Sequence, residues 1–412
     1  MGNFMVQENE EKKRILLCWG YNRASWIEHF EKIKNNFEFI YLFYYSASDE
    51  DDCYTDCKKY YFKQFSSAKE ILQKLKPSKV IFMGLEGFHT IAVNMEAQRK
   101  GIPTYYMLHG SSTISLDDQK YQKRNISLLK KISAPKISNY LFLLKFICGA
   151  LGLRNIFVLP KLLRLQYLKN KMAIQLALQK VQHKCRKPDF YIVYVEKDKL
   201  FLEEQDHARA EQFIVIGNPE LEKYLNASVD KQEYQEKYLL YIETPISEIS
   251  GHDFDIPLIT REEHIELIYK INEFAKCNNW RLYIKLHHYS YKTLYFPQDD
   301  NITYYREYDN VELILNAESI IFYTTSLATP AILFKKCIMF TIGDLNFFQA
   351  GVQKNGVCVT IAHSEIMNGQ LPEKYMCFRE DKKGLKNFYQ EFVGFDMNDE
   401  YPTLKLSKVL SS

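Results

Sequence analysis

The sequence of 412 residues lacks the cysteine patterns that mark disulfide scaffolds and zinc ribbons. Its nine cysteines are odd in number and scattered, Cys53 and Cys57 are the closest pair, and no CxxC occurs. Disulfide frameworks need even sets of cysteines, and zinc ribbons need closely paired ones. The pattern therefore favours reduced thiols in a cytosol-like compartment.

Common nucleotide-binding and metal-binding motifs are also missing. There is no GxxxxGK[ST] P-loop, no GxGxxG after a predicted strand and no HExxH. These absences remove the usual phosphate cradle, the dinucleotide fingerprint and the helical zinc motif. His287 and His288 are adjacent, and successive side chains at a strand end point to opposite sides. We therefore expect no metal site and no cofactor.

A long apolar run and a secretion signal are absent as well. The apolar stretch from Tyr140 to Leu153 has 14 residues and contains Lys145, whereas a spanning helix needs about 20. The opening MGNFMVQENEEKKR carries charges where a signal peptide needs an apolar core. Val6 stands where a myristoylation motif needs Ser or Thr. We expect a cytoplasmic protein whose membrane contact, if it makes any, is peripheral and on the inner membrane.

Acidic residues are missing from one whole segment. Residues 119–188 contain 16 Lys or Arg and no Asp or Glu, and the rest of the chain has 38 basic and 51 acidic residues, a net charge of −13. A short apolar stretch flanked only by cations suits a helix in the interface of an anionic membrane. A helical hairpin packed on its own domain, with a solvated basic face, is the alternative. A nucleic-acid groove is a third option, but no nucleic-acid motif accompanies the segment.

The remainder of the chain alternates between strand-like and helix-like patterns. Its length and its 46% apolar content suit two domains better than one. Apolar runs alternate with amphipathic helical spacings in both halves, which predicts parallel β-α-β units and an α/β fold. We expect an N-terminal domain at 1–212 with the basic insert 119–188, a C-terminal domain at 213–385, and a segment 386–412 that packs back on the N-terminal domain.

Two polar stretches end predicted strands in the first half. Glu86 and Gly87 precede a helix, where the carboxylate is either a general base or a complement to the helix dipole. In YYMLHGSST, His109 is followed by Gly110 and three hydroxyl residues. Such a turn can bind an anion, with the imidazole as base or phosphate ligand; a structural histidine is the alternative.

Four more polar stretches follow strands of the second half. Because ligands of open α/β sheets lie at the carboxyl ends of the strands, we expect these loops to converge. GNP specifies a turn whose backbone can line the cleft. The ETP loop can contact ribose or a base, or is simply exposed. Hydroxyls before a helix bind phosphate or cap the helix. The candidate residues are Gly217 and Asn218, Glu243 and Thr244, Lys285 and His287, and Thr324, Thr325 and Ser326.

Taken together, the motifs LEG, LHG, GNP, KLHH and YTTS resemble those of GT-B glycosyltransferases that build bacterial surface glycans. The pattern is most similar to bacterial sialyltransferases and polysialyltransferases and related Kdo transferases of capsule polysaccharide and lipooligosaccharide synthesis. Glu86-Gly87, His287-His288 and Thr325-Ser326 stand at that family's acidic-acidic-Gly, His-Pro and Ser/Thr-Ser motifs. The chain departs from the family twice, with Leu85 for the first acidic residue and His288 for the proline.

The resemblance implies a GT-B fold of two Rossmann-like domains whose parallel sheets face a central cleft, with acceptor in the N-terminal and nucleotide sugar in the C-terminal domain. It implies an inverting, metal-independent transfer of a nonulosonate, sialic acid or Kdo type, from a CMP-sugar to a glycan or lipid-linked glycan. His287, Lys285, Thr325 and Ser326 would bind the leaving phosphate, and Glu86 or His109 would be the base.

Two alternatives to this transferase stay open. The HG and GNP pieces are also similar to teichoic-acid glycerophosphotransferases, which use CDP-alditols; there His109 would be the base. The other alternative is a catalytically inactive glycan-binding or scaffold protein that has kept the fold.

Overall fold

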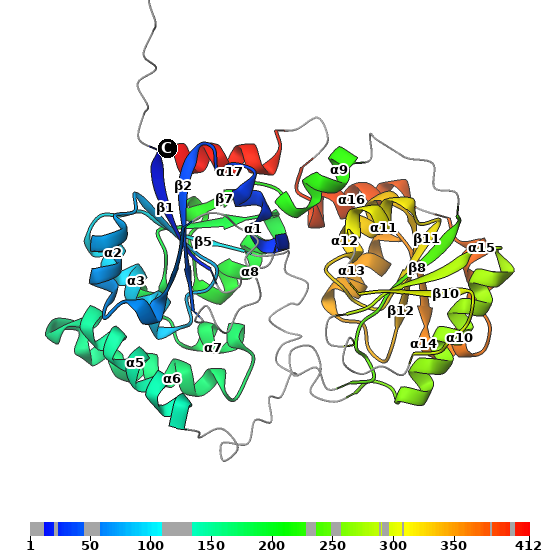
Figure 1. Ribbon diagram of the computed structural model, residues 1–412, viewed down its shortest axis with the longest axis horizontal. Coiled ribbons are helices and arrows are strands. Elements are labelled where there is room, and N and C mark those ends of the chain that lie inside the picture. Colours follow the sequence, from blue (N-terminus) through cyan, green and yellow to red (C-terminus); the bar gives the residue numbers. More distant parts are fainter. Residues whose placement is uncertain are drawn as a thin grey trace, which may run out of the picture.

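The computed structural model forms two α/β halves, each built on one parallel sheet (Figure 1). It describes residues 12–19, 24–44, 58–108, 134–227, 236–248, 257–287, 290, 296–306, 309–379, 381–395 and 400–412. The predicted α/β fold class is confirmed.

The N-terminal sheet has the strand order β3-β2-β1-β4-β5-β6-β7, and every pairing is parallel. Its central strands are continuous apolar runs, as expected for a sheet covered by helices on both faces. The strands are β1 (Lys13–Cys18), β2 (Phe37–Phe43), β3 (Lys58–Tyr61), β4 (Lys79–Phe82), β5 (Thr104–Met107), β6 (Phe190–Val193) and β7 (Phe213–Val215). The main helices are α1 (Ala24–Glu31), α2 (Ala68–Leu75), α3 (Phe88–Arg99) and α8 (Glu196–Asp206).

The C-terminal sheet has the order β10-β9-β8-β11-β12-β13, again all parallel. The strands are β8 (Tyr238–Ile242), β9 (Arg281–Lys285), β10 (Ile302–Tyr305), β11 (Ser319–Phe322), β12 (Lys336–Thr341) and β13 (Val359–Ala362). The helices of this half are α9 (Glu222–Ala227), α10 (Arg261–Cys277), α11 (Asn310–Asn316), α12 (Ala328–Phe334), α13 (Phe347–Asn355), α14 (His363–Met367), α15 (Leu371–Cys377) and α16 (Lys382–Phe392). The last helix, α17 (Pro402–Ser411), packs on the N-terminal sheet.

Both sheets change winding direction beside their first strand. In each order the chain first builds strands to one side of β1 or β8 and then crosses to β4 or β11 on the other. Such a switch point leaves a crevice at the carboxyl ends of the two strands, where open α/β sheets bind ligands. The loops after β1, β4, β8 and β11 are therefore the candidate ligand-binding loops.

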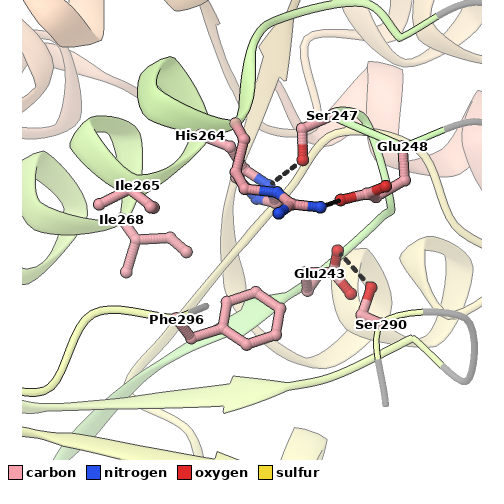
Figure 2. A pocket seen from close by; sticks show the side chains of 9 residues that line it. Glu243, Ser247, Glu248, His264, Ile265, Ile268, Ser290 and Phe296 are labelled. Carbon is pink, nitrogen blue, oxygen red and sulfur yellow. Dashed lines mark hydrogen bonds and ion pairs between the residues drawn. The ribbon is translucent and has the colours of Figure 1, made fainter. Parts of the chain in front are cut away.

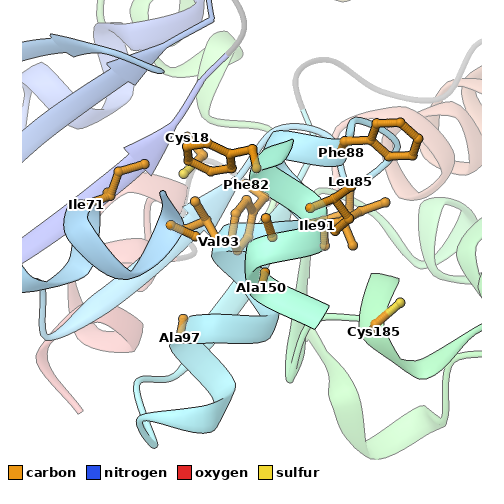
Figure 3. Packing of buried hydrophobic residues seen from close by; sticks show 14 of the residues in the cluster. Cys18, Ile71, Phe82, Leu85, Phe88, Ile91, Val93, Ala97, Ala150 and Cys185 are labelled. Carbon is orange, nitrogen blue, oxygen red and sulfur yellow. The ribbon is translucent and has the colours of Figure 1, made fainter. Parts of the chain in front are cut away.

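The described part of the basic segment, residues 134–188, is largely helical and is packed against helices of the N-terminal sheet. Its elements are α5 (Ala134–Leu151), η4 (Leu153–Val158), α6 (Leu159–Lys169), α7 (Ile174–Lys180) and η5 (Lys184–Arg186). Phe146, Ile147 and Ala150 of α5 share one core cluster with Phe82 and Ile91. Figure 3 shows Ala150 with Phe82 and Ile91 in this cluster. None of the helices in the described ranges is both long enough and apolar enough to cross a bilayer. One face of the segment is thus part of the domain core.

The C-terminal helix crosses back to the first half. Figure 1 shows α17 in red beside the blue strands β1 and β2, and Leu406 and Leu410 are buried in one cluster with Ile15 and Leu17. The buried carboxylate of Glu222 fixes the start of α17, because it accepts hydrogen bonds from the Thr403 N–H (2.6 Å) and hydroxyl (2.9 Å).

A second crossing runs beside the first. Gly217 has φ +87°, a conformation that favours glycine, and a Cβ there would lie 2.9 Å from Phe395 and Pro402. The Asn218 N–H donates to the Val393 carbonyl at 2.9 Å. The two chain segments that join the halves are therefore packed and hydrogen-bonded to each other.

Candidate active site

Three of the predicted loops meet at the carboxyl edge of the C-terminal sheet. In the parallel register, Ile242 at the end of β8 pairs with Lys285 of β9 on one side and with Phe322 of β11 on the other. Each strand ends there and is followed by a loop with polar side chains: residues 243–248 after β8, residues 286 and 287 after β9, and residues 323–327 after β11. The register of the sheet thus brings these three loops together.

Glu243 is the centre of this edge. It is 3% exposed. Its carboxylate accepts the His287 backbone N–H at 2.8 Å. It also accepts the Ser290 hydroxyl at 3.0 Å (Figure 2). The Ser290 N–H in turn donates to the His287 carbonyl at 2.9 Å. The carboxylate thereby fixes the turn that carries His287.

Burial raises the pKa of Glu243 to about 7, and the charge of Glu248 acts in the same direction. The hydrogen bonds from His287 and Ser290 oppose this, because they stabilise the ionised form. Glu243, whose carboxyl group titrates near neutral pH, therefore anchors the turn that carries His287, a candidate phosphate ligand. Its protonation and the geometry of that loop are consequently linked.

The β11 loop is tied to the same edge through Thr244. The Thr244 hydroxyl donates to the Thr324 carbonyl at 2.8 Å, which joins the loops on the two sides of the switch point. The Thr325 hydroxyl accepts the Leu327 N–H at 3.2 Å, so it serves the turn before α12. Ser326 is exposed. One hydroxyl of the predicted trio thus supports the turn, and a second faces outward.

Lys285 ends β9, the strand that leads into the His287 turn, but its side chain reaches toward the neighbouring strand β10. Its ammonium donates to the Arg306 carbonyl at the end of β10. His288 lies outside the described residues, and so do His109, Gly110 and the three hydroxyl residues after them.

A small pocket next to Glu243 contains residues that the sequence interpretation missed (Figure 2). His264 is buried between the Tyr241 hydroxyl (3.2 Å) and the Ser247 hydroxyl (3.0 Å), and burial lowers its pKa to about 4. Arg261 pairs with Glu248 at 2.6 Å. The signal for His264 was its helical spacing with buried Leu267, Ile268 and Ile271. The pocket is lined by Glu243, Ser247, Glu248, Arg261, His264, Ile265, Ile268, Ser290 and Phe296.

Glu86 follows β4, at the switch point of the other sheet. Its carbonyl accepts the Gln166 amide at 2.7 Å and the Lys169 ammonium at 3.1 Å, both from α6. Its carboxylate folds over Gly84, where a Cβ would overlap with Oε2. These contacts belong to the N-terminal half, and within the described ranges no hydrogen bond or ion pair connects Glu86 to the Glu243 cluster.

His89, one turn further on, is a second residue that the sequence interpretation missed. Its ring packs against Tyr44 and Phe62, with centroids 4.6 Å apart in both cases. Burial and the Lys169 charge lower the pKa of His89 to about 3. The imidazole is therefore neutral at physiological pH and is part of the packing behind the Glu86 loop.

Gly217 and Asn218 lie apart from the Glu243 cluster, at the crossing between the halves. The Asn218 side chain accepts the Glu220 N–H at 3.0 Å and caps η7 (Pro219–Leu221). Their nucleotide-binding role stays a prediction. Within the described ranges, no set of three His, Cys, Asp or Glu side chains is arranged to hold a metal ion.

Comparison with known proteins places the fold but not the reaction. No family model and no curated protein sequence matches the chain. Among solved structures, wall teichoic acid polymerase TagF is similar with TM-score 0.53 and 10% identity, over 97% of this chain and 88% of that one. CalG4, the calicheamicin glycosyltransferase, gives 0.52 and 12% over 97% and 98%. UDP-N-acetylglucosamine 2-epimerase from Rickettsia bellii gives 0.50 and 12% over 97% and 95%.

These similarities, with the two parallel sheets, define the GT-B fold of two Rossmann-like domains. The predicted GT-B architecture is confirmed. These similar structures include a polymerase, a glycosyltransferase and an epimerase, so the fold alone does not define the reaction.

The titration of Glu243 gives the first prediction. Its pKa rises from 4.5 to about 7 on folding, so the folded state binds the proton more tightly. Wild-type stability should therefore fall relative to Glu243→Gln as pH rises from 4.5 to 7, by on the order of 3 kcal/mol, and stay level above pH 7. Urea unfolding of both proteins across this range measures the difference. If the free energies of unfolding of the two proteins change with pH in the same way, the raised pKa of Glu243 is contradicted.

Proposed function

We propose that the chain is an inverting, metal-independent glycosyltransferase that moves a nonulosonate from a CMP-sugar donor to a bacterial surface glycan. The observation that carries this proposal is the hydrogen-bonded edge in which Glu243 holds the His287 turn and Thr244 holds the Thr324 loop. It lies at the switch point of a GT-B fold, where such sheets bind nucleotides.

In this proposal the donor loses CMP, so negative charge builds up on one departing phosphate. The His287 imidazole, as an N–H donor, and the hydroxyls of Thr325 and Ser326 would bind that phosphate, and Lys285 would add positive potential. Glu243 and Thr244 act by holding the two loops in register. Charge stabilisation then comes from protein donors already in place before the bond breaks.

The acceptor is assigned to the N-terminal half. Glu86, after β4, would take the proton from the acceptor hydroxyl as it attacks the anomeric carbon, and direct displacement would invert the configuration. His109 is the second candidate for this base. The acceptor is a glycan or a lipid-linked glycan, and the basic segment 119–188 would hold the enzyme at the anionic inner membrane surface.

A CDP-alditol phosphotransferase is the alternative that one observation favours. The similarity to wall teichoic acid polymerase TagF covers 97% of this chain. In that case the same phosphate-binding loops would hold the transferred group, and His109 would be the base. The donor therefore has to be determined by experiment.

Ligand-induced stabilisation distinguishes these functions. Millimolar CMP should raise the melting temperature, because a ligand at about 100 times its Kd adds about 2.7 kcal/mol. CMP, CDP, UDP and GDP compared by thermal shift identify the nucleotide, and product analysis separates transferred sugar from transferred phosphoalditol. If no nucleotide changes the melting temperature, a glycan-binding protein without transfer is favoured instead.

His287→Ala should reduce transfer by more than about 100-fold, as expected for loss of a transition-state donor. The substitution keeps the backbone N–H that Glu243 accepts, so the turn stays anchored and the imidazole alone is lost. Initial rates at saturating donor measure the effect. His207→Asn is the control, since His207 is exposed and has φ +49°, which asparagine tolerates. A rate near wild type for His287→Ala would remove the phosphate-binding role.

Glu86→Gln tests the base. Loss of general-base catalysis should lower kcat by roughly 100-fold or more, whereas the amide keeps the side chain's size. Exposed Glu211→Gln is the matched control. A full rate in Glu86→Gln together with a large loss in His109→Ala would assign the base to His109.

A further inference from the structure

We propose that the outward faces of α5, η4 and α6 dock on an anionic lipid surface, and that α6 couples this docking to the Glu86 loop held on its other side. The docking half stands independently of the reaction. The coupling half rests on the proposed function, because it concerns the loop that carries the candidate base.

Exposed apolar side chains are concentrated on this segment. Of the 13 large apolar side chains that are exposed in the described ranges, six lie between residues 140 and 167. Phe157 is the most exposed of them, at 71%. The six are Tyr140, Leu141, Ile156, Phe157, Leu163 and Tyr167. Such a concentration marks an interaction surface, whereas singly scattered residues do not.

The two faces of α6 are chemically distinct. Leu162 and Leu165 are buried in the domain core, whereas Leu163, Arg164 and Tyr167 are exposed. Residues three and four apart share a helix face, so the exposed three form one stripe of apolar and basic character. Helix α5 repeats the pattern with exposed Leu141 and Lys145 four residues apart. Figure 1 shows α5 and α6 together along the lower edge of the N-terminal half.

The positive charge of this surface favours an anionic lipid surface as its partner. Lys145, Lys161 and Arg164 are exposed, and residues 119–188 contain no acidic side chain to neutralise them. Within the described ranges, no ion pair involves these three cations. Aromatic and aliphatic side chains interleaved with cations match an interface of acyl chains under anionic headgroups. A protein partner would have to provide a separate acidic side chain for each of these cations.

Helix α6 connects this surface to the acceptor side of the candidate site. Gln166 and Lys169 each donate to the Glu86 carbonyl, at 2.7 and 3.1 Å. Neighbouring Tyr167 is exposed on the proposed lipid face. A helix fixed at the membrane would therefore also fix the position of the Glu86 loop, where a lipid-linked acceptor has to arrive.

Co-sedimentation of the full chain with vesicles tests the docking. The protein should bind vesicles of phosphatidylcholine with phosphatidylglycerol and not vesicles of phosphatidylcholine alone. Phe157→Ser/Leu163→Ser/Tyr167→Ser should weaken binding at least about tenfold, and Lys161→Gln/Arg164→Gln should weaken it about fivefold for each cation. Leu200→Ser/Met376→Ser is the matched control, since both residues are exposed elsewhere (64% and 66%).

The apolar triple variant should keep its melting temperature and its rate with a soluble acceptor, and lose rate with a vesicle-borne acceptor. Wild-type binding to neutral vesicles, or unchanged binding of the triple variant, overturns the docking. Concentration-dependent self-association that the triple variant abolishes, without vesicle binding, would assign the face to a second copy of the chain and also overturn it.

The coupling is tested with Gln166→Leu, which removes one donor to Glu86 and preserves side-chain size. It should lower kcat with a soluble acceptor about tenfold, as expected for a displaced base, and leave the donor KM and vesicle binding unchanged. Lys169→Arg, which keeps a donor, should retain the wild-type rate, and Lys169→Met should not. An unchanged kcat in Gln166→Leu overturns the coupling. If the chain transfers nothing at all, the proposed function fails, and the vesicle experiment still decides the docking.

Discussion

The parallel register of β8 with its two neighbours is the constraint on which the candidate site depends. Ile242 pairs with Lys285 and with Phe322, so three loops must begin side by side. Residues 44 positions apart, Glu243 and His287, then come within hydrogen-bonding distance. A slip of one residue would reverse which side chains of each strand face the core. The same register that buries Leu239 and Ile284 therefore also assembles the polar edge.

Within that edge, a buried carboxylate connects two loops by hydrogen bonds. Glu243 is stabilised by an N–H and a hydroxyl, and burial raises its pKa to about 7. Removing a charge from water is costly unless it is compensated, so this arrangement persists only while the His287 turn supplies its donors. The turn and the carboxylate are stable together, which makes the position of His287 a property of the fold.

The sequence indicated the sheets better than the site. Long apolar runs such as those of β1 and β8 are plain, because both of their faces are buried. The edge strands β3, β10 and β13 are harder to predict, because each has only four residues and at least half of those positions are not fully buried. Of the four loops expected to converge, three do so; the expectation is wrong for the turn of Gly217 and Asn218, which follows β7 of the N-terminal sheet. Glu243 was interpreted as a ligand of ribose or base, but a bond to a backbone N–H across two strands has no sequence signature.

The second switch point shows why one fold serves several reactions. After β4, the Glu86 loop is held by Gln166 and Lys169 of α6, which belong to the basic segment between β5 and β6. The sheet fixes where that loop begins, whereas the inserted helices fix its conformation. Loops and insertions are free to change while the sheet is kept, because their backbones lie at the surface. In this chain the sheet sets where the Glu86 loop starts, and the inserted helix α6 holds it by two hydrogen bonds.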